Sequence, residues 1–191
     1  MKLATLASAV LLLAAPLALA QTSVWKSDPM HSEVDFTVRH MSITNVRGRL
    51  GPVNATIDYN SQDVSKSTVQ ATINVSAINT GVTPRDNDLK SAKFFDVAQY
   101  PNATFVSTKV SRAGSGLLVD GNLTIKGITK PVVLHVDGPT ATVIGMDKKT
   151  HEGFSATTTL DRREFDLEPS LPDSIVSDQV TLTIDLDVAK Q

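Results

Sequence analysis

The chain has 191 residues, no cysteine, 18 basic and 20 acidic side chains, and a formal net charge of −2. The lack of cysteine excludes disulfides, thiolate nucleophiles and iron–sulfur clusters. The nearly balanced charge argues against nucleic acid or an anionic membrane surface as a partner. A chain of this length suits one domain of about 100 to 200 residues. The sequence does not determine the oligomeric state, and it leaves a homodimer open.

The first 20 residues, MKLATLASAVLLLAAPLALA, have the order of a secretory signal peptide. One lysine precedes a run of Leu, Val and Ala, and small residues stand at Ala18 and Ala20, which predicts cleavage after Ala20. The run is broken at Pro16 and is shorter than the roughly 20 apolar residues of a membrane span. We therefore expect residues 1–20 to be removed and 21–191 to form one domain in a bacterial periplasm, without a membrane span.

Apolar and polar residues alternate through most of 21–191, which is typical of strands with one wet face. The alternation is clearest in 33–39, 69–76 and 180–188. About eight strands with hairpin-length connections and no crossover helix predict an all-β fold, either a closed meander barrel or a sandwich. The remaining strands are expected at 52–59, 103–111, 117–126, 131–137 and 153–161.

The segment 79–101 interrupts this pattern, because it is too long for a hairpin turn and carries its own apolar residues. Thr83 followed by Pro84 is a plausible helix start, and Leu89 falls at helical spacing from 93–95, so a short helical excursion is predicted. Connections of this length are usually lids or plugs. The sequence leaves a mobile gate and a fixed hydrophobic stopper as equal alternatives.

The stretch HSEVDFTVRHM, residues 31–41, contains the residue types of a hydrolase. On a strand His40 and Asp35 face opposite sides, and His31 and Asp35 lie about 13 Å apart on the same side, so a Ser-His-Asp relay within this strand is excluded. Ser32 also lacks the Gly-x-Ser-x-Gly turn that exposes a nucleophile. An enzyme that uses His40 with acids from neighbouring strands is the alternative to a binding protein.

The four histidines, His31, His40, His135 and His151, show neither helical i, i+4 spacing nor the His-x-His spacing of a strand. Either pattern would present two imidazoles to one ion. We therefore expect no metal site, and no cofactor.

Five segments carry a resemblance to a known family: DPMHSEVDFTVRHM, VRGRLG, INTGVTPRDNDLKSAKFFDVAQYPNATF, VDGNLTIKGITKPVVLHV and GFSATTTLDRREFDL. Together they resemble the YceI family of bacterial periplasmic proteins over nearly the whole chain after residue 20. The resemblance implies a single extended antiparallel eight-stranded lipocalin-like β-barrel with a short helical lid. It also implies an apolar tunnel that holds a polyisoprenoid or another long-chain amphiphilic lipid.

Under this resemblance the tunnel is lined by inward-facing apolar residues of several strands, with two phenylalanines closing one end and His40 and Arg85 near a polar head. Alternation alone favours an ordinary filled core for the same positions. Leu50 and Asp88 depart from the usual family pattern. Leu50 bears on the width of the tunnel and Asp88 on the polarity near the lid, so both affect which ligand fits. The expected lining residues are Val34, Phe36, Val38, His40, Leu50, Ile73, Val75, Arg85, Phe94, Phe95, Phe105, Leu123, Ile125, Leu182 and Ile184.

The predicted function is a non-catalytic periplasmic carrier of an isoprenoid or other long-chain lipid. Arg39 and His31 are further candidates for contact with an anionic head, because cationic groups suit anionic oxygens. Arg39 has the wrong parity for the tunnel, so Arg85 is preferred. A module that binds a protein through exposed strand edges is a third alternative.

Overall fold

The computed structural model describes residues 22–191. The predicted signal peptide and its cleavage point after Ala20 lie outside the described residues. No helix among residues 22–191 combines the length and the apolar character needed to cross a membrane.

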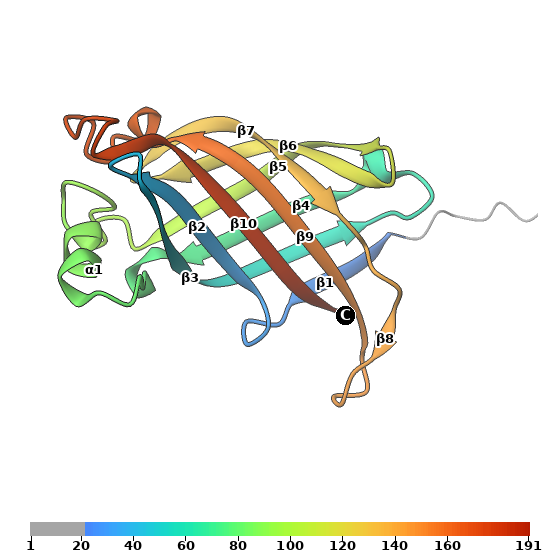
Figure 1. Cartoon of the computed structure of the whole chain (residues 1–191). Coiled ribbons are helices and arrows are strands. Elements are labelled where there is room, and N and C mark those ends of the chain that lie inside the picture. The colour runs from blue at the N-terminus through green and yellow to red at the C-terminus, as the bar shows by residue number, and fades with distance from the viewer. Residues whose placement is uncertain (1–21) are drawn as a thin grey trace, which may run out of the picture.

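The described chain is almost entirely strand, with one α-helix and three short 3-10 turns (Figure 1). The strands are β1 (Ser23–Ser27), β2 (Glu33–His40), β3 (Thr44–Tyr59), β4 (Thr68–Asn74), β5 (Asn102–Ala113), β6 (Gly116–Ile125), β7 (Ile128–Asp137), β8 (Val143–Ile144), β9 (Thr150–Asp161) and β10 (Val176–Lys190). The helix α1 spans Thr83–Lys90, and the 3-10 turns are η1 (Val64–Lys66), η2 (Val75–Ala77) and η3 (Arg162–Phe165).

Eight of these strands close into a ring in the order β10-β2-β3-β4-β5-β6-β7-β9, and β9 returns to pair with β10. Every pairing is antiparallel. The expected all-β barrel is confirmed, and the sandwich alternative is excluded. The sequence did not predict β1, which pairs with β10 and β3, or the two-residue β8, which pairs with β9.

Strand pairing explains which side chains face the interior. In the β2–β10 pair, Phe36 lies opposite Leu182 and Val34 opposite Ile184, and these are the inward positions of both strands. Closing a sheet into a barrel sends alternate residues inward, so the period-two pattern of the sequence becomes the core.

A β-bulge at Leu50 changes the inward parity of β3. Val34 pairs with Gly51 and Asp35 with Arg49, so Leu50 is the extra residue. Gly51 has a φ of 147°, and a Cβ atom there would lie 2.0 Å from the carbonyl oxygen of Asn74. Only glycine fits this position, because a side chain would collide with backbone.

The end of the barrel remote from α1 is closed by a small packed cluster of Trp25, Ile57, Phe154 and Val188. Tyr59 meets Phe154 edge to face, with ring centroids 6.1 Å apart. Trp25 comes from β1, which pairs with both β10 and β3 and so fills the place between them beyond the start of β2.

The segment 79–101 crosses the opposite end of the barrel, where α1 lies (Figure 1). The helix begins at Thr83 as predicted but ends at Lys90, where the Ser91 backbone turns extended. Phe95 N–H donates to the carbonyl of Leu89, so a turn, not helical spacing, presents Phe94 and Phe95. No residue of α1 itself is buried.

Candidate functional site

A cavity of about 370 Å³ lies between the 79–101 segment and the barrel interior. Its volume falls within the range of about 300 to 1,000 Å³ that is usual for small-molecule sites. Apolar side chains dominate the lining, and the charged or hydrogen-bonding ones are His40, Arg85, Asp88 and Arg162. The lining residues are Phe36, Val38, His40, Val46, Leu50, Arg85, Asp88, Leu89, Phe94, Phe95, Ile125, Leu160, Arg162, Phe165, Leu167, Val176, Val180 and Leu182.

The structure brings together one subset of the residues proposed from sequence. Around this cavity stand Phe36, Val38, His40, Leu50, Arg85, Phe94, Phe95, Ile125 and Leu182. Others lie in the packed core and line neither interior cavity: Val34, Ile73, Val75, Phe105 and Leu123. Alternation identifies the inward face of a strand, but it does not say how far along the barrel a residue lies.

A second interior cavity of about 70 Å³ occupies the other half of the barrel, and its lining is mainly apolar. Ile184 faces this cavity, whereas Leu182, the preceding inward residue of β10, faces the larger one. On β9, Leu160 lines the first cavity and Ala156 the second, with buried Thr158 between them. Thr158 therefore marks the level between the two cavities on β9.

Leu123 occupies the same level on β6, because Ile125 lines the larger cavity and Val119 the smaller. Phe105 pairs with Leu123 across β5 and β6. A Cβ atom on Gly121 would lie 2.3 Å from the Phe105 ring, so glycine leaves room for that ring. The residues at the level between the two interior cavities, Phe105, Leu123 and Thr158, are called the dividing layer here.

Arg162 is a buried lining residue that the sequence analysis missed. Its guanidinium, 3% exposed, donates to the carbonyl oxygens of Leu167, Glu168, Leu171, Val176 and Ser177, and forms an ion pair of 2.8 Å with Asp178. These contacts hold the β9–β10 connection against the barrel. One signal could have found it: Arg162 continues the even-numbered inward series of β9.

Two of the predicted head-group residues stand at this end of the barrel. His40 ends β2, lies opposite Val176 and Thr44, and lines the cavity. Arg85 donates from Nε to the Thr80 hydroxyl at 2.8 Å and from Nη2 to the Thr80 carbonyl at 3.1 Å. These bonds fix the arginine at the cavity wall, where Asp88 also stands.

The other two candidates lie away from the cavity. The Arg39 side chain is exposed and donates to Asn45 Oδ1 at 3.1 Å, as its parity predicted. His31 is exposed and forms an ion pair of 2.7 Å with Asp28 in the β1–β2 connection. Neither side chain lines the cavity.

The lining, within the described residues, offers no hydroxyl or thiol nucleophile. Within residues 22–191, the side chains around the cavity include no serine, threonine or tyrosine hydroxyl. Ser32, the serine beside His31, donates to the backbone carbonyl of Asp187 at 3.1 Å. Nucleophilic catalysis needs a nucleophile within hydrogen-bond reach of its base. The arrangement is suited to binding an apolar ligand.

Acidic partners perturb two histidines outside the cavity. The hydrogen bond that His31 donates to the Asp28 carboxylate raises the pKa of His31 and lowers the pKa of Asp28. Hydrogen bonds to the carboxylates of Asp187 and, to a smaller extent, Asp147 raise the pKa of His151. The sequence showed no metal-ligand spacing among the histidines, yet the fold brings ligand atoms of Asp28, His31 and Asp187 within 4.8 Å of one another.

Residues 25–188 match the model of the YceI-like domain. The YceI protein of Salmonella newport is 32% identical over 165 residues, which cover 84% of this chain and 83% of that protein. The crystal structure of the Campylobacter jejuni YceI protein superposes with a TM-score of 0.70 at 29% identity, covering 78% of this chain and 87% of that one.

A more distant structure shares the fold. A polyisoprenoid binding domain from Saccharophagus degradans superposes with a TM-score of 0.65 at 16% identity. The superposition covers 90% of this chain and 100% of that domain. The family match extends from β1 to β10 and so includes the whole barrel. This chain belongs to the YceI-like family.

Proposed function

We propose that the protein is a non-catalytic carrier that binds a polyisoprenoid or a similar long-chain lipid in the larger cavity. The observation that carries the proposal is the apolar cavity of about 370 Å³ at the α1 end of a closed barrel. The polyisoprenoid binding domain from Saccharophagus degradans, which shares the fold, supports this ligand class.

The energetics of such a site favour chain length over head-group chemistry. Each methylene buried contributes about 0.8 kcal/mol, so roughly ten give about 8 kcal/mol before the ordering of the ligand subtracts several. Polar groups in the lining are few, and several donors of Arg162 and Arg85 are already engaged by protein acceptors. The lipid tail would therefore supply most of the affinity.

The 79–101 segment is anchored to the barrel at Asn79 and Phe95, whereas its helix α1 is exposed. Phe95 is buried, and the pair Arg49 and Asn79 exchange two backbone hydrogen bonds at 2.8 and 3.0 Å. By contrast, α1 buries no residue. Segments with few buried contacts open at low free-energy cost. We place the gate at α1 and Phe94, with Phe95 as its anchor.

Residues 1–20 support export, and we propose the periplasm as the site of action. Fractionation of the native producer should release the protein with the periplasmic contents, in a form that begins at Gln21. Recovery of a form that retains residues 1–20 in the membrane fraction would contradict this localisation.

A length series of ligands tests the binding function. Delipidated protein is titrated with prenyl alcohols of increasing chain length, and with fatty acids for comparison. Affinity should rise about fourfold for each added methylene until the cavity is filled, and then level off. Affinity that does not depend on chain length would exclude the larger cavity as the binding site.

A further inference from the structure

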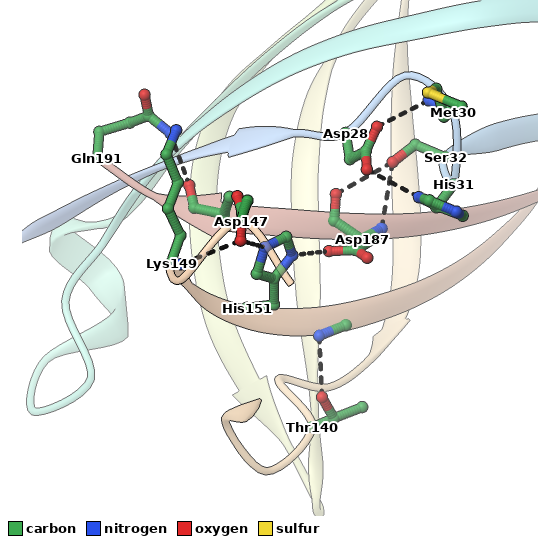
Figure 2. Close-up of polar contacts among 12 residues, drawn as sticks. Asp28, Met30, His31, Ser32, Thr140, Asp147, Lys149, His151, Asp187 and Gln191 are labelled. Carbon is green, nitrogen blue, oxygen red and sulfur yellow. Dashed lines mark hydrogen bonds and ion pairs between the residues drawn. The ribbon is translucent and has the colours of Figure 1, made fainter. Parts of the chain in front are cut away.

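A second polar cluster lies at the barrel end remote from the larger cavity. Asp28 and His31 belong to the connection between β1 and β2, and Asp187 belongs to the C-terminal part of β10. One ligand atom from each of Asp28, His31 and Asp187 lies within 4.8 Å of the others. Figure 2 shows Asp28 paired with His31 and the Asp187 carboxylate directed toward His151. Asp187 lies more than 150 residues after Asp28 and His31 in the sequence, so spacing could not reveal the cluster.

Backbone contacts hold the two segments together independently of these side chains. Asp28 N–H donates to the Asp187 carbonyl at 2.8 Å, and so does the Ser32 hydroxyl, at 3.1 Å. Asp187 N–H in turn donates to Ser32 Oγ at 3.1 Å. The cluster is therefore built on a fixed frame, as an ion-binding site requires.

Outer contacts orient both carboxylates. The backbone N–H of Met30 donates to Asp28 Oδ1 at 2.9 Å, which leaves Oδ2 beside His31 Nδ1 at 2.7 Å. His151 Nδ1 lies 2.6 Å from Asp187 Oδ1, and its Nε2 lies 3.1 Å from Asp147. Only 13% of the His151 side chain is exposed. Metal ligands are commonly oriented by outer histidine–carboxylate pairs of this kind.

The charges in the cluster do not balance. Three carboxylates, those of Asp28, Asp147 and Asp187, meet two imidazoles, those of His31 and His151. Exposed ion pairs of this type contribute little to stability. A bound cation would neutralise the excess negative charge that the fixed frame gathers here.

The cluster is also accessible. A cleft of about 400 Å³ runs beside it, lined in part by His31, His151 and Asp187 and bordered by Thr140 and Val143 of the β7–β9 connection. The exposed His31 side chain can rotate to shorten the separations toward the roughly 2.0–2.2 Å ligand distances of zinc. The cleft leaves a further coordination position open to water.

We propose that Asp28, His31 and Asp187 form a surface site for a borderline divalent transition-metal ion such as Zn²⁺. One imidazole nitrogen with carboxylate oxygens suits zinc and its neighbours, whereas calcium and magnesium prefer oxygen ligands alone. His151 acts as the outer group that orients Asp187. The ion fastens the β1–β2 connection to β10, in a region separate from the lipid cavity.

The test uses the whole exported protein, from which bound metal has been removed with a chelator followed by dialysis. Isothermal titration with zinc chloride should show one ion per chain, and thermal melting should show a higher midpoint with zinc than with calcium or magnesium. His31→Ala should abolish this binding, and His151→Ala should weaken it about 10- to 100-fold. His135→Ala, on an exposed position of β7, is the matched control and should bind as the parent does.

The His31 side chain is 66% exposed, so His31→Ala should fold normally, which circular dichroism verifies. The proposal is overturned if the parent protein does not bind zinc. It is equally overturned if His31→Ala binds zinc as tightly as the parent, or if His135→Ala is the variant that loses binding. Lipid extracted from each variant reports separately on the proposed carrier function, because none of these residues lines the larger cavity.

Discussion

Leu182 and Ile184 occupy consecutive inward positions on β10, yet they face different cavities. Leu182 lines the cavity of about 370 Å³ below α1, and Ile184 lines the cavity of about 70 Å³ in the other half of the barrel. The change occurs across one step of the strand, at the level of the dividing layer of Phe105, Leu123 and Thr158. Under the proposed function, this layer would limit the length of the lipid chain in the larger cavity.

Phe105→Ala should join the two cavities and allow a longer lipid tail to enter. Removal of a buried phenylalanine costs about 3 to 5 kcal/mol, so the thermal midpoint should also fall. The measurement is the mass of lipid extracted from the variant and from the parent. Val188→Ala, in the packed cluster at the closed end, is the control and should lower the midpoint without changing the lipid. An unchanged lipid mass in Phe105→Ala would show that the layer does not limit chain length.

Val38 and Thr37 are adjacent on β2 and similar in size, but Val38 lines the larger cavity and Thr37 faces outward. Val38→Phe should expel lipid with little loss of stability, because overpacking costs about 1 to 3 kcal/mol where protein atoms fill the space and less where a ligand does. Thr37→Phe should keep its lipid. Extracted lipid per mole of protein and the thermal midpoint are measured for both. Lipid loss in Thr37→Phe alone would reverse the assignment of the cavity face.

Phe94 and Phe95 should respond differently to replacement by serine. Phe94 is half-buried at the cavity, whereas Phe95 is 7% exposed and packs in the core. Phe94→Ser should speed lipid exchange and leave the midpoint close to that of the parent. Phe95→Ser should lower the midpoint, by analogy with the cost of about 3 to 5 kcal/mol for other large core deletions. If neither variant changes the exchange rate, the segment is a fixed stopper.

Low pH should destabilise the start of the 79–101 segment. The hydrogen bond from the Thr80 hydroxyl, at 2.6 Å, lowers the pKa of Asp86, with smaller contributions from Lys90 and Arg85. A carboxyl whose folded pKa is lowered adds stability above its unfolded pKa of about 3.9, and that stability is lost as the pH falls through the folded value. Asp86→Asn should remove this part of the acid dependence.

Thermal midpoints of the parent and of Asp86→Asn are measured from about pH 6 down to about pH 2.5, which spans the titration of aspartates. The two midpoints should differ most near about pH 6 and converge as the pH falls. Other carboxyls titrate in both proteins, so the difference between them isolates Asp86. A constant difference across this range would contradict the assigned role.

Much of the barrel could be predicted from the sequence because alternation reports burial directly. The runs at 33–39 and 180–188 became β2 and β10, and Thr83 with Pro84 did begin the helix. Features that depend on pairing could not be predicted this way. The bulge at Leu50 is visible only in the register with β2, and β1 is too short to show a period.

The sequence predicted which face of each strand points toward the cavity, but not how far along the barrel axis each residue lies. Phe36, Val38 and Leu182 line the cavity, whereas Phe105 and Leu123 share their inward orientation but lie in the dividing layer. Position along the barrel axis depends on strand stagger, which the pattern of one strand does not contain. Contacts between distant segments were also hidden, as with Arg162 and the β9–β10 connection.

Native mass spectrometry of protein purified from the periplasm, followed by organic extraction, tests the carrier function most directly. A carrier should hold one long-chain lipid of reproducible mass per chain, and this lipid should be lost in Val38→Phe and retained in Thr37→Phe. Protein that carries no lipid from the cell and takes up none of the prenyl alcohols, or that returns a supplied lipid in chemically altered form, would contradict it.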